Sequence, residues 1–240
     1  MAAALLQTRD LSMHFGGVQA VRNVNFTLAE GELRCLIGPN GAGKSTFFKM
    51  LTGQLQPSYG KVLFRGHDIS NAHAHLIARL GIGIKTQVPS VFDGLSVREN
   101  IWLAANRIHQ RARVNQVVDE MLQRIGLTAA ANRLVGQLAH GQRQWVELGI
   151  VLSTDPELIL LDEPAAGMTH EEVYKTAELV REINRSKALI VVEHDMQFIR
   201  MIAKTVTVFN QGSVLVEDAV ENILRNPLVR DIYLGKRAAA

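Results

Sequence analysis

One stretch constrains this chain more than any other. Residues 38–45 read Gly38-Pro39-Asn40-Gly41-Ala42-Gly43-Lys44-Ser45 and match G-x-x-x-x-G-K-[ST], the phosphate-binding P-loop. The stretch follows a predicted strand over 32–37 and precedes a predicted helix over 45–51. Its glycines let the backbone wrap closely around phosphates, while backbone N–H groups and the helix N-terminus attract negative charge. The alternative, a chance glycine-rich turn, does not explain this context. We therefore predict a nucleoside triphosphate site.

Side chains of the same stretch have separable roles in that site. Lys44 is positioned to reach the β- and γ-phosphates, and the Ser45 hydroxyl is a candidate Mg²⁺ ligand. Thr46, the next residue, is included among the predicted nucleotide-binding residues.

Composition limits the class of protein. The 240 residues, 47% of them hydrophobic, suit one large or two small domains. A net charge of +3 neither demands nucleic acid nor excludes an anionic membrane surface. The single cysteine, Cys35, cannot form an intrachain disulfide, which favours a reducing compartment. No apolar stretch approaches the roughly 20 residues needed to cross a bilayer, and the Met-Ala-Ala-Ala start lacks signal-peptide features. We expect a soluble chain that a partner holds wherever it works at a membrane.

The first third of the chain reads mainly as strands. Expected strands cover 5–11, 24–28, 61–64 and 82–86, the last ending at Gln87. A turn is expected at 14–17, and it carries Phe15. Phe15 either stacks on an adenine ring or fills the core beneath the turn, and the sequence does not separate these alternatives.

The character of the chain changes to helix from 88 to 152. A capping box at 96–99 opens a helix through Ala105, and a second helix over 111–125 ends at Gly126. Apolar residues of the second helix recur at helical spacing, which predicts a core face. A basic cluster at 107–113 reads as a solvated helix end, with docking or lipid contact as the alternative.

Strands and helices alternate again after residue 153. The apolar runs 158–161 and 188–192 predict parallel strands buried on both faces. Between them, a capping box at 169–172 starts a helix to about Asn184. Segments 205–209 and 213–216 predict a hairpin.

Three polar residues follow the buried strands, where parallel sheets place their chemistry. Asp162 fits a carboxylate that holds Mg²⁺, and Glu163 fits a general base for an attacking water. His194 fits a residue that contacts the γ-phosphate. Structural roles are the alternatives: a turn cap for Glu163 and a core position for His194.

These pieces together resemble the nucleotide-binding subunits of ATP-binding-cassette (ABC) transporters over almost the whole chain. In family order they are Phe15 at the adenine position, 38–45 as Walker A, Gln87 at the Q-loop, the signature Leu138-Ala139-His140-Gly141-Gln142, Walker B at 158–163, the turn at 164–168 and the switch His194. The resemblance implies an α/β P-loop NTPase fold, with a RecA-like core, an antiparallel β-subdomain and an inserted α-helical subdomain. It implies one ABC ATPase domain over 1–240, with core and β-subdomain in 1–87 and 151–240 and the helical part in 88–150.

The resemblance also implies the machinery. ATP and Mg²⁺ are the expected cofactors, with Ser45, Gln87 and Asp162 around the metal and Glu163, His194 and Lys44 as catalytic residues. Two cassettes dimerise head to tail, so that Ala139, His140, Gly141 and Gln142 contact the ATP bound by the partner's P-loop. The expected partners are integral-membrane permease subunits, a second ABC ATPase subunit and, indirectly, a solute-binding protein, but no nucleic acid. The expected location is the cytoplasmic face of a bacterial plasma membrane.

Departures from the common family pattern narrow the subfamily. The signature is commonly Leu-Ser-Gly-Gly-Gln, whereas this chain has Ala139 and His140 at its second and third positions. The turn after Walker B commonly ends Leu-Asp, but here it reads Met168-Thr169. Residues 13–21 resemble importers for branched-chain amino acids, and 140–147 with 167–169 are more like their urea-transporter branch. A urea importer ATPase is therefore the expectation, with a branched-chain amino acid or short-amide importer as the alternative.

Other classes remain as alternatives. A soluble cassette ATPase of DNA repair or translation usually carries two cassettes or a long coiled-coil insertion, and this chain has neither. A small-molecule kinase leaves the signature and His194 unexplained. Segment 88–100 is a candidate permease contact through Val91, Phe92 and Leu95, which equally could close the core of the helical subdomain. The dimer partner is expected to be a related but different ATPase rather than a second copy.

Overall fold

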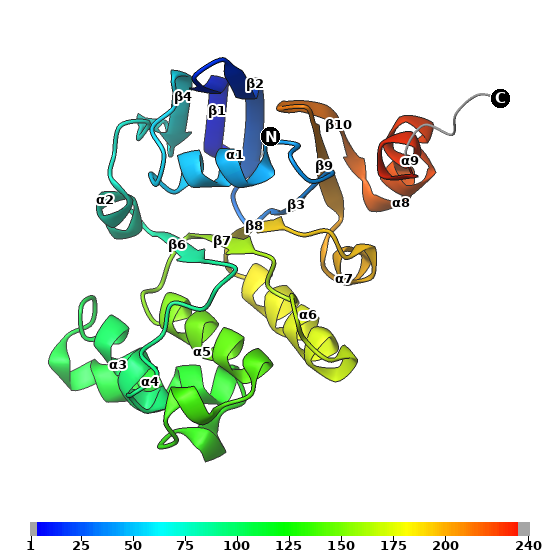
Figure 1. The fold of residues 1–240 in the computed structure, drawn as a ribbon. Helices are drawn as coiled ribbons and strands as arrows, with labels where there is room; N and C mark the ends of the chain where they lie inside the picture. Colours follow the sequence, from blue (N-terminus) through cyan, green and yellow to red (C-terminus); the bar gives the residue numbers. More distant parts are fainter. Residues whose placement is uncertain (1–3, 235–240) are drawn as a thin grey trace.

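A six-stranded sheet forms the centre of the molecule (Figure 1). The structure is a computed structural model that describes residues 4–234. Its order is β10-β9-β3-β8-β7-β6. The strands are β3 (Leu33–Ile37), β6 (Ile82–Lys85), β7 (Leu158–Asp162), β8 (Ala188–Val192), β9 (Thr205–Asn210) and β10 (Ser213–Ala219). All neighbours pair in parallel except β10, which forms the predicted hairpin with β9. The predicted α/β class is confirmed.

The inner strands are apolar on both faces because a different core covers each face. Successive side chains of β3 alternate between these cores. Cys35 and Ile37 join one hydrophobic cluster, whose helical members come from the middle and C-terminal parts of the chain. Leu36 joins the other, beneath the N-terminal sheet. The continuous apolar runs therefore mark strands enclosed by two layers.

A four-stranded antiparallel sheet covers one of these cores. Its order is β2-β1-β4-β5, with β1 (Ala4–Phe15), β2 (Val18–Ala29), β4 (Tyr59–Phe64) and β5 (His67–Asp68). The strands are longer than predicted, because β1 and β2 continue to a turn of only two glycines, Gly16 and Gly17. Phe15 therefore ends a strand instead of lying within a turn. Helix α1 (Lys44–Leu51) packs between the two sheets (Figure 1) and buries Phe47, Phe48, Met50 and Leu51.

Helices α3 (Val97–Ala105), α4 (Arg111–Arg124) and α5 (His140–Leu152) gather at one end of the molecule, away from the antiparallel sheet (Figure 1). The predicted capping box of α3 is present, with the Ser96 hydroxyl and the Glu99 carboxylate each bonded to the other's backbone. Helix α4 ends where Gly126 adopts φ 69°. Its predicted apolar face is buried, apart from a partly exposed Met121.

The remaining helices flank the parallel strands. Helix α6 (His170–Asn184) starts at the predicted capping box of Thr169 and Glu172. Four helices have no counterpart in the sequence prediction: α2 (Ala74–Arg79), α7 (Met196–Ile202), α8 (Val220–Arg225) and α9 (Pro227–Leu234). Each is too short for a 3.6-residue period to be recognised. Across residues 4–234, no helix has both the length and the apolar character that crossing a membrane requires.

Phe47 is the side chain through which α1 is held between the sheets. It is fully buried, with ring centroids 5.6 Å from Phe26 and 5.1 Å from Phe209. We expect Phe47→Ala to lower the free energy of unfolding by about 3–5 kcal/mol, through lost burial and a cavity. Phe92→Ala is the control, because that side chain is 64% exposed. Equal urea midpoints for the two variants would contradict this role of Phe47.

Candidate functional site

The P-loop connects the end of β3 to the start of α1, and its shape requires glycine. Gly38, Gly41 and Gly43 adopt φ angles of 149°, 76° and 98°. A Cβ atom on Gly38 would lie 2.2 Å from the Phe209 carbonyl oxygen, and one on Gly43 would lie 2.5 Å from that of Ala20. Two of the three glycines are thus dictated by close backbone approach as well as by conformation. The predicted strand, loop and helix context is confirmed.

A cavity of about 560 Å³ opens in front of this loop. P-loop residues 40–46 form one wall, and the rest includes Phe15, Glu163 and the β9–β10 turn. Phe15 is 47% exposed at the cavity, so the alternative that it fills the core is wrong. The lining also includes residues that the sequence reasoning missed: Val18, Gln19, Ala20, Arg22, Val192, Gln211 and Gly212. The first three lie in the stretch 13–21 that carries the importer resemblance, but nothing in the sequence placed them, or the other four, at the nucleotide site.

Lys44 folds back onto the loop that carries it. Its Nζ donates hydrogen bonds to the carbonyl oxygens of Gly38 at 2.6 Å and Pro39 at 3.0 Å. Burial lowers the pKa of Lys44, and the nearby carboxylates of Glu163 and Asp162 oppose that shift. The ammonium group is therefore a partly desolvated cation at the edge of the cavity.

Glu163 is the point where the predicted polar residues meet. Gln87 Nε2 donates to Glu163 Oε2 at 2.7 Å, and His194 Nδ1 lies 3.4 Å from Glu163 Oε1. Glu163 also has φ 45°, an uncommon conformation for a residue other than glycine. Its backbone N–H donates to the Val192 carbonyl oxygen at 2.9 Å, which holds the turn there. The structure thus brings Gln87, Glu163 and His194 together from three separate segments.

A second cavity of about 490 Å³ adjoins the P-loop and shares Asn40 and Glu163 with the first. It is lined by Gly38, Pro39, Asn40, Glu163, His194 and Ile232. Ile232 belongs to α9, one of the helices that the sequence reasoning missed.

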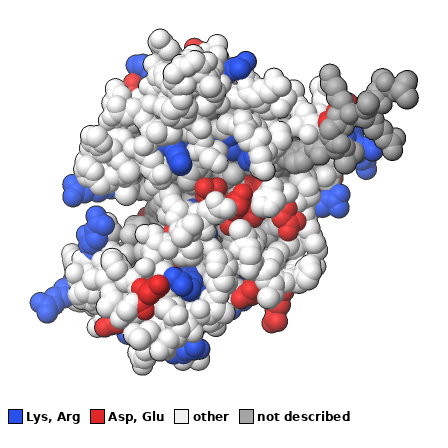
Figure 2. All heavy atoms as spheres, in the orientation of Figure 1, with Lys and Arg blue, Asp and Glu red and all other residues white. Residues whose placement is uncertain are grey.

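Asp162 ends β7 beside Glu163. Burial, followed by the negative charge of Glu163, raises the pKa of Asp162, while Lys85, Lys49 and Lys44 oppose this. Figure 2 shows acidic side chains near the middle of this face, over the six-stranded sheet. Such an environment favours a bound cation.

The residues present fit Mg²⁺ in particular. Within residues 4–234 there is no group of three or more His, Cys, Asp or Glu side chains that could hold a metal by themselves. Mg²⁺ commonly takes only one or two protein ligands and completes its octahedron with phosphate oxygens and water. Asp162, together with Ser45 in the cavity wall, meets that requirement.

Glu193 is a functional candidate that the sequence reasoning did not single out. It is 2% exposed, and its carboxylate accepts hydrogen bonds from the backbone N–H groups of Ala165, His194 and Asp195. Burial raises the pKa of Glu193, and these hydrogen bonds oppose that shift. It joins the turn after β7 to the segment of His194. Its position directly after a buried strand was the available sequence signal.

Residues 139–142 lie apart from the P-loop of the same chain, and neither P-loop cavity is lined by them. They occupy the N-terminus of α5, where Gln142 Oε1 accepts a hydrogen bond from Ala139 N–H at 3.2 Å. His140 is exposed, and its Nε2 lies 3.2 Å from the Ala166 carbonyl oxygen. The helix N-terminus at this position can attract an anion.

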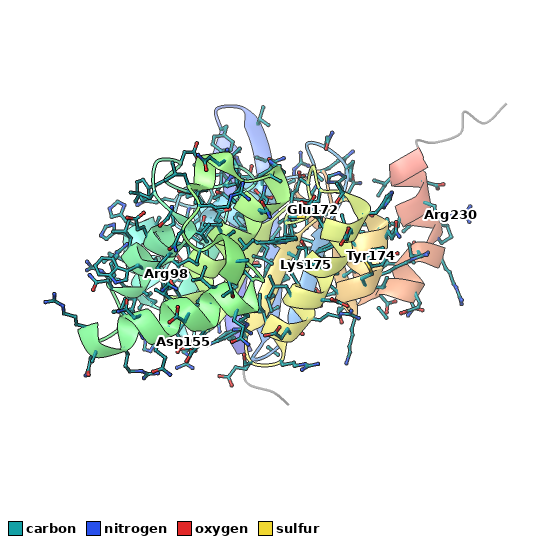
Figure 3. The ribbon with its side chains drawn as sticks, turned by 90° about the horizontal axis from the view of Figure 1, so that it is seen from below. Arg98, Asp155, Glu172, Tyr174, Lys175 and Arg230 are labelled. Carbon is teal, nitrogen blue, oxygen red and sulfur yellow. The ribbon has the colours of Figure 1, made fainter. Side chains whose placement is uncertain are left out.

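Gly141 is covered from within its own chain. A Cβ atom there would lie 2.4 Å from Oε1 of Glu172, whose side chain caps α6. Figure 3 shows Glu172 and Lys175 where α6 runs beside α5. Lys175 Nζ lies 3.9 Å from the centre of the Trp145 ring, a cation–π contact between the same helices.

Comparisons with known proteins agree with this geometry. A family profile described as "ABC transporter" matches residues 21–166. The high-affinity branched-chain amino acid transport ATP-binding protein LivG of Escherichia coli is 35% identical, covering 98% of this chain and 100% of LivG. BraF of Pseudomonas aeruginosa, named for the same transport, is 32% identical over 98% of this chain and 100% of BraF. The crystal structure of a nucleotide-free ATP-binding cassette from an ABC transporter superposes with a TM-score of 0.87 at 26% identity, covering 98% of this chain and 100% of that one.

The Gly141–Glu172 contact supplies a prediction for the isolated protein. Gly141→Ala should lower the free energy of unfolding by about 1–3 kcal/mol, because the added methyl group overlaps the Glu172 carboxylate. Glu172→Ala removes that overlap but also a helix cap, at a cost of about 1 kcal/mol. Urea unfolding of both single variants and the double variant, without nucleotide, should therefore show that the double variant loses less than the two losses added together. Strict additivity would show that the contact does not exist in solution.

Proposed function

Because the chain belongs to the ABC transporter family and is an ATPase of that family, we propose that it powers a membrane importer by closing and opening a dimer around ATP. The observation that supports this best is the meeting of Gln87, Glu163 and His194 beside the P-loop.

ATP would bind in the 560 Å³ cavity, with its adenine on the half-exposed ring of Phe15 and its phosphates against residues 38–46. Lys44 would exchange the carbonyl oxygens of Gly38 and Pro39 for phosphate oxygens, which are stronger, charge-assisted acceptors. Ser45, Asp162 and Gln87 would hold Mg²⁺, which when bound offsets phosphate charge and helps to orient the γ-phosphate.

Hydrolysis would use Glu163 as the general base for the attacking water. Its two carboxylate oxygens already face two different residues, Gln87 and His194. Gln87 would report nucleotide occupancy to its loop, and His194 would contact the γ-phosphate and orient the water. Glu193 would hold the His194 segment in place through its buried backbone contacts.

The site within one chain lacks the signature, so a second cassette would complete it. Residues 139–142 lie outside both P-loop cavities, and His140 is exposed. In a head-to-tail dimer the N-terminus of α5 would face the partner's γ-phosphate through backbone N–H groups, without the serine hydroxyl that Ala139 lacks. ATP binding would favour the closed dimer, and phosphate release would favour opening. The partner is proposed to be a related but different ATPase.

The importer's permease would contact the segment that precedes α3. Val88 is 78% exposed and Phe92 is 64% exposed, whereas Val91 packs against the hydrophobic core. The two readings of this segment therefore apply to different residues: Phe92 is available for a partner and Val91 closes the core. Such a contact would place the chain at the cytoplasmic face of the plasma membrane, next to permease subunits that receive cargo from a solute-binding protein.

Branched-chain amino acids are the cargo that we propose. LivG and BraF carry that transport in their names and align along their whole length with this chain. The urea prediction rests on 140–147 and 167–169, and these relatives do not support it. A soluble role in DNA repair or translation is disfavoured by the same relatives.

We expect Glu163→Gln to reduce ATP hydrolysis by about 10²–10⁴-fold. ATP affinity should stay within about threefold, because the P-loop is unchanged, and an ATP-dependent dimer should become visible by size-exclusion chromatography. Glu171→Gln, at an exposed position on α6, is the matched control and should hydrolyse normally. Normal turnover in Glu163→Gln would exclude the proposed role.

The cargo is tested through the permease. The tagged chain should co-purify with integral-membrane subunits from its own cell membrane. In vesicles, ATPase activity of that complex should rise with a leucine-loaded binding protein and not with urea. Stimulation by urea alone would restore the urea assignment, and failure to recover any membrane protein would count against an importer.

A further inference from the structure

Behind the loop that carries Gln87, two charged side chains are buried with no role in the steps above. Lys85 ends β6 and is 1% exposed, and Glu147 lies on α5 and is 3% exposed. Lys85 Nζ is 3.9 Å from Glu147 Oε2. Burial lowers the pKa of Lys85 and raises the pKa of Glu147, so both charged forms are costly at this place.

The costs are only partly offset by the pair itself. Glu147 Oε2 is buried and has no hydrogen-bond partner, and the ammonium group is at the far limit of an ion pair. A well-packed apolar pair often replaces a buried ion pair without loss of stability, so stability alone is a weak explanation for these residues.

The contacts of the other carboxylate oxygen of Glu147 give a better reason for the buried pair, because that oxygen holds the loop 86–90. Glu147 Oε1 accepts hydrogen bonds from Ser90 N–H at 3.1 Å and Thr86 N–H at 3.4 Å. It also lies 3.2 Å from Thr86 Oγ1, whose proton is shared with the Val88 carbonyl oxygen at 2.8 Å. One turn earlier on α5, Gln144 Nε2 donates to the Gln87 carbonyl oxygen at 3.3 Å. Two side chains of one helix therefore fasten the loop 86–90 on both sides of Gln87.

Further polar contacts link this loop to Glu163 beside the P-loop and to His140 in the signature. The Gln87 side chain reaches Glu163 Oε2 at 2.7 Å. In the other direction, Gln144 Nε2 lies 3.3 Å from Nε2 of His140, in the signature at the start of the same helix. A contiguous set of polar contacts thus connects the carboxylate beside the P-loop to the signature that would serve the partner's ATP.

We propose that Glu147 is a positioning residue, whose buried carboxylate fixes loop 86–90 to α5 and thereby holds Gln87 against Glu163. The inference rests on the proposed function of Gln87 and Glu163. It adds that the loop and the signature helix move as one body, so that a displacement of either one displaces the other. Lys85 lies on the other side of the carboxylate, with its Nζ 3.9 Å from the Glu147 oxygen that the loop does not use.

Two double variants separate anchoring from charge pairing. Lys85→Met with Glu147→Gln removes both charges but keeps a side-chain carbonyl oxygen for Ser90 and Thr86. Lys85→Met with Glu147→Met removes the same charges and the acceptor as well, with a side chain of similar length. Neither leaves one member of the Lys85–Glu147 pair buried without the other, so thermal unfolding should confirm that both fold.

Both double variants lack the Lys85 charge, which also acts on Asp162, so their kcat values are compared with each other. The methionine double variant should have a kcat about 10–100-fold below that of the glutamine double variant, since Gln87 is no longer held in place, while the ATP affinities of the two stay equal. Hydrogen exchange, read without nucleotide, should show faster exchange of the Thr86 and Ser90 amides in the methionine variant only. This second readout does not depend on activity.

A milder variant covers the case in which the methionine double variant does not fold. Thr86→Val removes a half-buried hydroxyl that faces both Glu147 Oε1 and the Val88 carbonyl oxygen, and it should lower kcat by a smaller factor, again at unchanged ATP affinity. Equal kcat and equal amide exchange in the two double variants would overturn the positioning role. Absence of ATPase activity in the unmodified protein would instead overturn the proposed function and leave the exchange result to decide the anchoring.

Discussion

The parallel pairing of β3, β8 and β7 is the constraint on which the site depends. These strands end at one edge in register, since Leu36 of β3 pairs with Val192 of β8, which in turn pairs with Asp162 of β7. The hydrogen bonds continue one residue further: Glu163 N–H donates to the Val192 carbonyl oxygen, and Glu193 N–H donates to that of Leu36. The P-loop, Asp162, Glu163 and Glu193 therefore emerge side by side, although about 155 residues separate the first from the last.

That edge places several carboxylates in a poorly solvated environment, and the fold offsets them with fixed groups. Backbone N–H groups serve Glu193, lysine ammonium groups lie near Asp162, and Glu163 is contacted by Gln87 and His194. Burial raises the pKa of Asp162 and lowers the pKa of Lys44, so the charged form of each is disfavoured by its surroundings, and in the proposed function a triphosphate with its metal would offset this.

The helical end of the molecule carries its own constraints, and they differ from those of the sheet. The Glu172 carboxylate of the same chain leaves no room for a side chain at position 141, so a glycine is needed there. This packing requirement is separate from the proposed contact of Gly141 with a partner's nucleotide. Any side chain placed there would meet the Glu172 carboxylate of α6 within the same chain. Buried polar residues on α5 then tie this end to the Gln87 loop.

Several features were determined by the sequence alone, because each rests on local chemistry. The P-loop with its strand and helix, the apolar strands at 158–161 and 188–192, and the capping boxes of α3 and α6 all follow from neighbouring residues and appear as predicted. Only the tertiary structure decided that Phe15 is exposed at the cavity, that Glu193 organises the turn beside His194, and that Ile232 reaches the P-loop. The short helices α2, α7, α8 and α9 belong to this second group too. Their existence, like the burial of Lys85 and Glu147, depends on packing between segments distant in sequence, which no periodicity within six to eight residues can express.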